Sequence, residues 1–188
     1  MKKRIAFGSI GLASGLSAYG YYFTERIIHI KKKNEKEIIQ REINLNHFDP
    51  RIFEQIPKRD VWIASPHGYR IHALVLHPHE AKRYVIFSHG VTEFHISSMK
   101  YANLFLERGF NAVLYDHRRH GKTGGETTSY GFYEKDDLKA VVDWLLDEEG
   151  DILLGIHGES MGAATTILYA GELDGRADFY VLDCPFSD

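Results

Sequence analysis

The chain has 188 residues, of which 44% are hydrophobic and 26% charged, values typical of one globular domain. Its formal charge of -3 provides no basic surface for a phosphate backbone, so we expect no nucleic-acid partner. The single cysteine, Cys184, excludes a disulfide within the chain, and because free cysteines are usually buried we expect it in the core.

The N-terminus has the pattern of a membrane segment. Residues 5–24 carry no charge and lie between the basic residues 2–4 and a second basic cluster that begins at Arg26. As an α-helix this run would be about 30 Å long, enough to cross a bilayer. We interpret residues 1–25 as a membrane anchor, with a cleaved signal peptide and a buried helix as alternatives. Because basic residues flank both ends, the side of the membrane stays open.

Two glycines in this run, Gly11 and Gly15, form a G-x-x-x-G pattern. Such small residues let two helices approach closely, so the pattern is compatible with a dimer of anchor helices, although it also arises readily by chance in a glycine-rich run.

The next segment, residues 26–58, is mostly charged with scattered apolar positions, which predicts a polar juxtamembrane helix and linker. Asp49-Pro50 and Pro57 interrupt it. From residue 59 to residue 188, short apolar strands alternate with longer helical patterns. This alternation predicts an α/β domain, with a mostly parallel sheet covered by helices on both faces.

The predicted elements of this domain follow in a regular order. We expect a hairpin first, then strands and helices in alternation, and a last strand close to residue 188. Their ranges are 60–78 for the hairpin, 83–90, 110–118, 151–157 and 177–185 for the strands, and 97–109, 132–150 and a segment beginning near Ser160 for the helices.

The strand at 151–157 runs directly into Gly158-Glu159-Ser160-Met161-Gly162 and then into an apolar helix. In this context Gly-x-Ser-x-Gly is typical of a nucleophile on a sharp strand-to-helix turn. The turn strains the serine backbone, so the residues two before and two after it must lack side chains, as Gly158 and Gly162 do. The alternative is that Ser160 is a simple N-cap, which needs no flanking glycines.

Three motifs in this order resemble the α/β-hydrolase superfamily, in its serine esterase, lysophospholipase and serine-peptidase-like branch. They are FSHGVTEF at 87–94, YDHRRHGKTGG at 115–125 and GIHGESMGA at 155–163. The resemblance covers roughly residues 60–188. It implies a membrane-anchored bacterial serine hydrolase that cleaves an ester, thioester or amide substrate through an acyl-enzyme, without a cofactor. The choice between esterase, thioesterase and peptidase stays open.

The resemblance assigns a role to each matching position. Ser160 would be the nucleophile, and the N–H groups of Val91 and Met161 would form the oxyanion hole. The remaining positions would shape the elbow and its neighbouring loop rather than react, although the basic loop at 116–120 has a simple solvated alternative. These shaping residues are Gly158, Gly162, His89, Gly90, Asp116, Arg118 and Gly121. We expect no metal, because no histidine pair has the cysteine or glutamate spacing of a zinc site.

The catalytic acid and base are missing from the pattern. In the family an acid and then a histidine follow the serine, but no histidine follows Ser160. Asp183, at the end of the sixth strand, occupies the position that a minority of relatives use for the acid. We therefore expect no catalytic base in this chain and a domain truncated at its C-terminal side to about three quarters. We expect the longer parent protein to be catalytically competent. The alternative is a catalytically inactive binding or scaffold module at the membrane.

Overall fold

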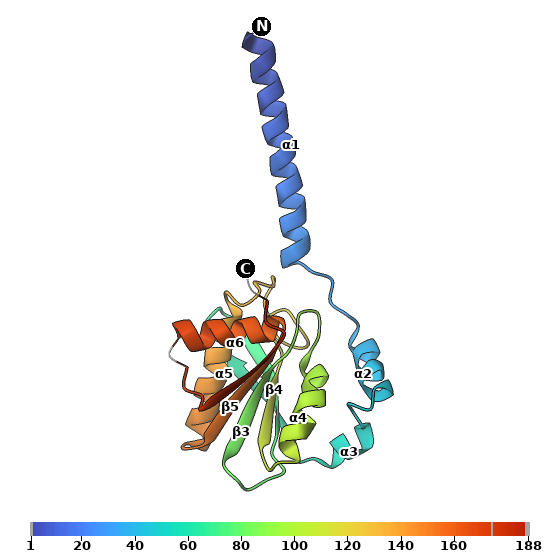
Figure 1. Cartoon of the computed structure of the whole chain (residues 1–188), viewed down its shortest axis with the longest axis vertical. Helices are drawn as coiled ribbons and strands as arrows, with labels where there is room; N and C mark the ends of the chain where they lie inside the picture. Colours follow the sequence, from blue (N-terminus) through green and yellow to red (C-terminus); the bar gives the residue numbers. More distant parts are fainter. Residues whose placement is uncertain (1, 174, 187–188) are drawn as a thin grey trace. The chain divides into compact units, whose positions relative to one another are not determined.

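The computed structural model describes residues 2–173 and 175–186, with side chains from residue 15 onward (Figure 1). It divides into two compact units, Met1–Lys31 and Lys32–Asp188. The first unit contains one helix, α1 (Lys2–Ile28).

Among the described residues, no helix is both long enough and apolar enough to cross a membrane. The transmembrane helix expected at residues 1–25 is therefore not supported by the described residues. Gly11 of the expected helix-pairing motif lies outside the described side chains.

The second unit begins with two short helices, α2 (Glu35–Asn44) and α3 (Pro50–Gln55). Each begins at a capping side chain, since Asn34 accepts the Lys36 N–H and Asp49 accepts the Arg51 N–H, both at 2.9 Å. The sequence predicted a polar helix and linker here, and its charged pattern gave no sign that Ile38, which is only 2% exposed, packs in the core. The charged pattern concealed this packing because the second buried position of α2 is a glutamate, Glu42.

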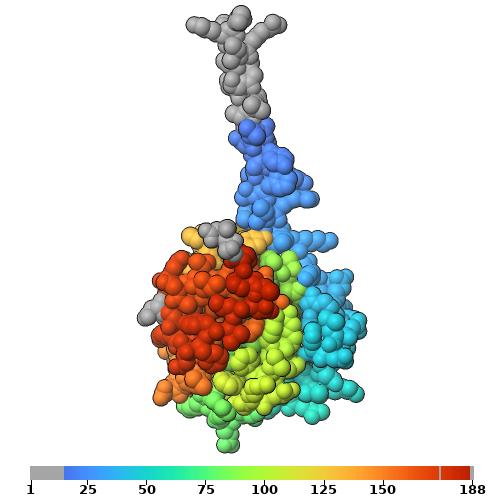
Figure 2. All heavy atoms as spheres, in the orientation of Figure 1, coloured from blue at the N-terminus to red at the C-terminus, as the bar shows by residue number. Residues whose placement is uncertain are grey.

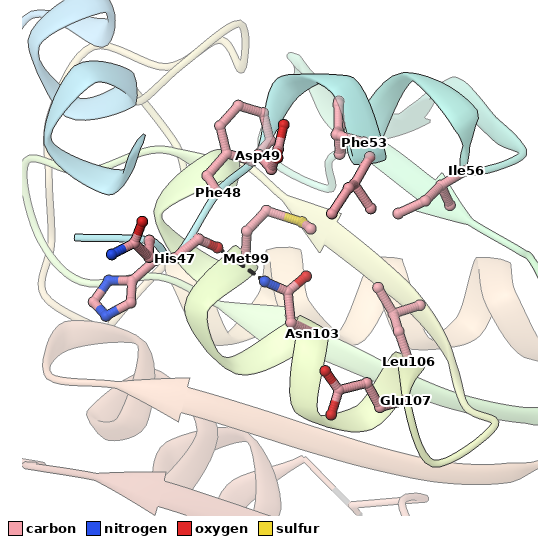
Figure 3. A pocket seen from close by; sticks show the side chains of 11 residues that line it. His47, Phe48, Asp49, Phe53, Ile56, Met99, Asn103, Leu106 and Glu107 are labelled. Atoms are coloured by element: carbon pink, nitrogen blue, oxygen red, sulfur yellow. Dashed lines mark hydrogen bonds between the residues drawn. The ribbon is translucent and has the colours of Figure 1, made fainter. Parts of the chain in front are cut away.

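A cavity of about 270 Å³ lies between residues 46–56, which include α3, and the helix α4 (Met99–Leu106). Figure 3 shows the side chains that line it. Phe48 and Phe53 lie on one side of it, and Met99 and Leu106 on the other. The side-chain amide of Asn103 donates to the His47 carbonyl oxygen at 2.9 Å and so joins the two segments. None of the lining residues belongs to the predicted catalytic motifs.

A six-stranded sheet forms the centre, in the order β1-β2-β4-β3-β5-β6. The β1–β2 and β2–β4 pairs are antiparallel, and the three other pairs are parallel, so the sheet is mostly parallel as expected. The strands are β1 (Lys58–Ala64), β2 (Arg70–Leu76), β3 (Arg83–Ser88), β4 (Asn111–Tyr115), β5 (Leu153–Glu159) and β6 (Phe179–Asp183).

Helices cover both faces of this sheet (Figure 1). The helices α2 and α4, with a short 3-10 helix at His95–Ser98, pack through one apolar cluster. The helices α5 (Glu134–Glu149) and α6 (Met161–Glu172) pack through another cluster on the opposite face. This arrangement confirms the α/β fold class that the alternating pattern predicted.

In the described part of the chain β6 is an edge strand, and Val181 and Leu182 on it are exposed. Figure 2 shows the atoms of α6 and β6 on the face turned to the viewer. Cys184 follows β6 and is exposed. The expectation that it is buried was wrong, because no element of the described residues packs over the chain just after β6.

Candidate active site

The turn from β5 into α6 holds Ser160 in a strained conformation. Its φ of 52° and ψ of -112° lie in a region that residues with a side chain rarely adopt. The Ser160 N–H donates to the Asp183 carbonyl oxygen at 2.8 Å, and the Ser160 carbonyl accepts the Ala164 N–H at 3.0 Å. The half-buried side chain makes no capping hydrogen bond to the helix. The N-cap interpretation therefore does not describe Ser160.

The flanking glycines are required by close backbone contacts. A Cβ atom on Gly158 would lie 2.6 Å from the Cα atom of Ala163 and from the carbonyl oxygen of Gly162. A Cβ atom on Gly162 would overlap the Ser88 carbonyl oxygen and lie 2.8 Å from that of His89. These contacts leave no room for any side chain, as the motif predicted.

Residues 89–95 follow β3 and form the predicted oxyanion loop. It lies against the serine, because a Cβ atom on Gly90 would be 3.7 Å from the Ser160 Cβ atom. Neither the Val91 N–H nor the Met161 N–H has a hydrogen-bond acceptor within the described residues. Two unpaired N–H groups beside a serine are able to hold negative charge on a substrate oxygen.

His89 is a structural residue of this loop. Its Nδ1–H donates to the Gly90 carbonyl oxygen at 2.8 Å, and its Nε2 accepts the His117 N–H at 3.1 Å. Burial holds the pKa of His89 well below its ordinary value, so the ring is neutral at physiological pH. A ring with both nitrogens engaged is not available as a base for Ser160.

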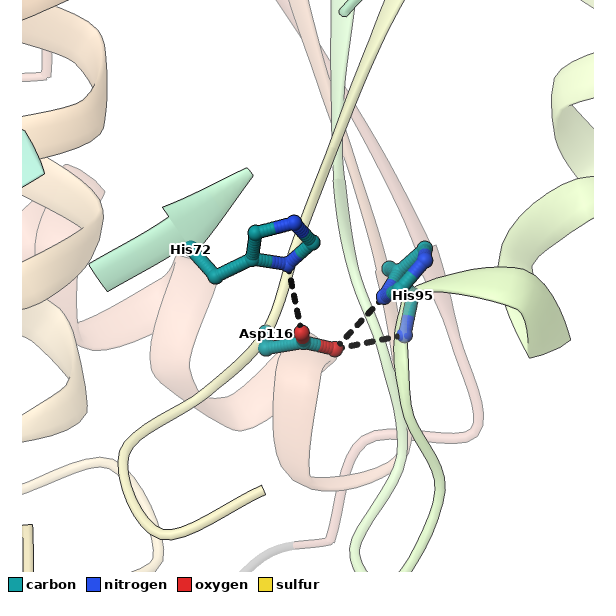
Figure 4. A group of neighbouring side chains, drawn as sticks. All are labelled: His72, His95 and Asp116. Atoms are coloured by element: carbon teal, nitrogen blue, oxygen red, sulfur yellow. Dashed lines mark hydrogen bonds and ion pairs between the residues drawn. The ribbon is translucent and has the colours of Figure 1, made fainter. Parts of the chain in front are cut away.

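Asp116 joins the ends of several elements (Figure 4). One of its oxygens accepts the backbone N–H and the Nδ1–H of His95, both at 2.9 Å. The other accepts the Nδ1–H of His72 at 2.8 Å and the Lys122 N–H at 3.1 Å. Burial alone would raise the pKa of Asp116, but the charge of His95 and these hydrogen bonds outweigh it and hold the pKa below its ordinary range.

The loop after β4 is buried rather than solvated, which rejects the alternative stated for its basic residues. The Arg118 side chain is 8% exposed and its guanidinium lies over the rings of Tyr133 and Tyr69, at 4.6 and 5.6 Å. Gly121 has a φ of 47°, and a Cβ atom on it would overlap the Asp116 carboxylate. These contacts are what a loop-ordering role requires.

Comparisons with known proteins agree with this geometry. Residues 79–188 match the family described as serine aminopeptidase, S33. The chain belongs to this family. YqkD, an uncharacterized protein of Bacillus subtilis, is 47% identical over 187 residues, which are 98% of this chain and 61% of the relative.

Two solved structures support the same fold for this serine aminopeptidase family member. An esterase from Pyrococcus furiosus is 30% identical, with a TM-score of 0.66 over 73% of this chain and 55% of that chain. A thermostable carboxyl esterase from Bacillus coagulans is 21% identical, with a TM-score of 0.59 over 68% of this chain and 44% of that chain. The chain thus has an α/β-hydrolase fold and spans about half the length of these esterases.

The Asp183 side chain is hydrogen-bonded by two nearby residues, Tyr101 and Cys184. Its carboxylate accepts hydrogen bonds from the Tyr101 hydroxyl and, at 3.1 Å, from the Cys184 thiol. The hydrogen bond from Tyr101 lowers the pKa of Asp183. The main chain of Asp183 contacts Ser160 directly, whereas no histidine nitrogen hydrogen-bonds the Ser160 side chain in residues 2–173 and 175–186.

The ligand atoms of His72, His95 and Asp116 lie within 4.8 Å of one another, close enough to suggest a metal site. Each Asp116 oxygen already accepts two hydrogen bonds, and the second ring nitrogen of His72 bonds Asp60 at 2.6 Å. Hydrogen bonding therefore accounts for the convergence. His72 and His95 carry no sequence signal for this cluster, because the β2–β4 register brings His72 to Asp116 and the fold of the segment after β3 brings His95 there.

Proposed function

We propose that the whole protein is a serine hydrolase that forms an acyl-enzyme on Ser160. The strained Ser160 turn between two sterically required glycines is the observation that carries this proposal. The hydroxyl would attack a carbonyl carbon, and the N–H groups of Val91 and Met161 would stabilise the oxyanion. The leaving group departs with a proton, and water then releases the acyl group as an acid.

We propose a small acyl, ester or peptide compound as the substrate. The family description points to amide cleavage, whereas the similar solved structures are esterases. Hydrolysis of matched short-chain esters, acyl thioesters and aminoacyl amides would distinguish these classes by their kcat/KM values. No residue of this chain is assigned as the general base.

A fluorophosphonate probe tests the proposal directly. The whole protein should be labelled at one site, and Ser160→Ala should abolish the labelling. Ser17→Ala, which changes an exposed serine of α1, is the control and should label like the wild type. Undiminished labelling and esterase activity in Ser160→Ala would refute the proposed function.

We also propose that the N-terminal segment associates with a membrane. Four aromatic side chains of α1 are exposed, and basic residues follow them in the sequence, a combination that favours the interface of an anionic bilayer. The aromatic residues are Tyr19, Tyr21, Tyr22 and Phe23. Removal of residues 1–31, which form a separate unit, should shift the protein from the membrane fraction to the supernatant. An unchanged distribution would contradict the proposal.

A further inference from the structure

The oxyanion loop contains a backbone conformation that the residue type at that position does not favour. Thr92 has a φ of 68°, in the left-handed region where a β-branched side chain is strained. Such a residue keeps its conformation only where the surroundings hold it. The contacts that hold Thr92 and its neighbours therefore decide where the adjacent Val91 N–H lies.

One set of contacts comes from the loop after β4. The Nε2 atom of His120 accepts the Thr92 N–H at 3.0 Å. At the far end of the oxyanion loop, Asp116 accepts the His95 N–H at 2.9 Å. These bonds fix the inner side of the oxyanion loop against the sheet.

A second set comes from α2 and from Lys33, two residues before it, on the outer side. The Lys33 N–H donates to the Thr92 carbonyl oxygen at 3.3 Å. The Arg41 guanidinium binds the Glu93 carboxylate with two nitrogens, at 3.0 and 2.8 Å, and the Lys33 ammonium also contacts this carboxylate. A two-point guanidinium–carboxylate pair fixes orientation as well as distance. The α2 helix is itself held in the core by Ile38.

The Glu93 side chain is only 10% exposed and, like the candidate nucleophile, lies close to Gly90. Its Cγ atom would be 4.0 Å from a Cβ atom on Gly90, and that position is 3.7 Å from the Ser160 Cβ atom. Burial alone would raise the pKa of Glu93, but its hydrogen bonds to Arg41 and Lys33 lower it, so the carboxylate is charged at neutral pH.

We infer that α2 positions the oxyanion loop through the Arg41–Glu93 pair, and that Arg41 is a positioning residue for the hydrolysis proposed above. This inference rests on the proposed function of Ser160. Without the pair, the outer side of the loop is free to relax at Thr92, and the Val91 N–H moves away from the developing oxyanion. Stabilisation of the oxyanion depends steeply on that position.

The test uses the whole protein and a short-chain chromogenic ester. Arg41→Met should lower kcat by about 10- to 100-fold, a part of what the loss of one oxyanion donor costs, and should change KM less than about threefold. A trifluoromethyl ketone, which forms an oxyanion on the serine, should lose as much affinity as kcat/KM loses. An analogue with a methylene group in place of the carbonyl should bind as before, a difference that general unfolding does not produce.

Three further variants separate positioning from simple destabilisation. Arg51→Met, which removes an exposed arginine paired with Asp49 on α3, is the matched control and should behave as wild type. Arg41→Lys keeps the positive charge but not the two-nitrogen contact of the guanidinium, and should give a kcat between those of Arg41→Met and the wild type. Glu93→Gln keeps the side-chain shape, and its effect should not add to that of Arg41→Met.

Each outcome decides the inference. If Arg41→Met and Glu93→Gln keep kcat and ketone affinity within twofold while Ser160→Ala is inactive, the inference is overturned and the proposed function stands. Equal losses for the ketone and the methylene analogue would also overturn it. Activity in Ser160→Ala would overturn both together. If Arg41→Met does not fold, Arg41→Lys and Glu93→Gln still supply the comparison.

Discussion

Replacing Gly162 by alanine perturbs the turn at its tightest point. The added Cβ atom would lie 2.8 Å from the His89 carbonyl oxygen, about 0.5 Å short of an ordinary C···O contact, and would overlap the Ser88 carbonyl oxygen. Both oxygens are backbone atoms of a buried strand end, so the start of α6 must move instead. Overpacking against fixed atoms costs about 3 kcal/mol, and the better helix propensity of alanine returns about 1 kcal/mol. The free energy of unfolding should therefore fall by about 2 kcal/mol.

Urea denaturation followed by circular dichroism measures this loss in the present chain. The matched control is Gly171→Ala in the same helix, where a Cβ atom meets nothing within 4 Å and alanine should stabilise by about 0.5–1 kcal/mol. In the whole protein, the displacement should also lower kcat about 100-fold. If Gly162→Ala is as stable as Gly171→Ala, the steric argument for the turn is wrong.

Three further predictions concern two buried histidines, the buried Ile38 and the partly exposed Asp183. Burial holds the pKa of His117 at about 3 and that of His157 at about 4, so as pH falls below about 6.5 the unfolded chain gains protons that the folded chain does not. Each of these two rings should lower the free energy of unfolding by up to about 1.4 kcal/mol per pH unit. His72 acts in the opposite direction, because its carboxylate partners raise its pKa against the effect of burial. Urea midpoints that do not change between pH 7 and 5 would contradict this prediction. Ile38→Ala should cost about 2–4 kcal/mol in the same denaturation assay, and a loss below 1 kcal/mol would mean that α2 is not part of the core. In the whole protein Asp183→Asn should lower kcat/KM less than tenfold, whereas loss of a triad acid costs about 10⁴-fold.

Features that depend on short-range backbone chemistry were predictable from the sequence. The glycines at 158 and 162 predict a turn without room for side chains at these positions, and the contacts found there agree with that prediction. The alternation of apolar strands and amphipathic helices indicated the mostly parallel sheet. Both signals act within a few residues or repeat along one element, so no knowledge of distant contacts is needed.

Other features were hidden because they depend on residues far apart in the chain. The packing of α2 was missed because one of its buried positions is Glu42, and a glutamate in a sequence is normally read as a surface residue. In the structure Arg41 and His47 hydrogen-bond its carboxylate. The exposure of Cys184 was missed as well, because it depends on what covers the last strand rather than on the residue type.

The sequence by itself determined the strand-to-helix turn at Ser160, because steric exclusion around a strained residue is a local property of the backbone. Only the tertiary structure decided what surrounds that turn. The antiparallel β2–β4 register brings His72 to Asp116, and the docking of α2 brings Arg41 to Glu93. Hydrogen bonds and ion pairs act over a few ångströms of space, and residues 44 or 52 positions apart share that space only after the chain has folded.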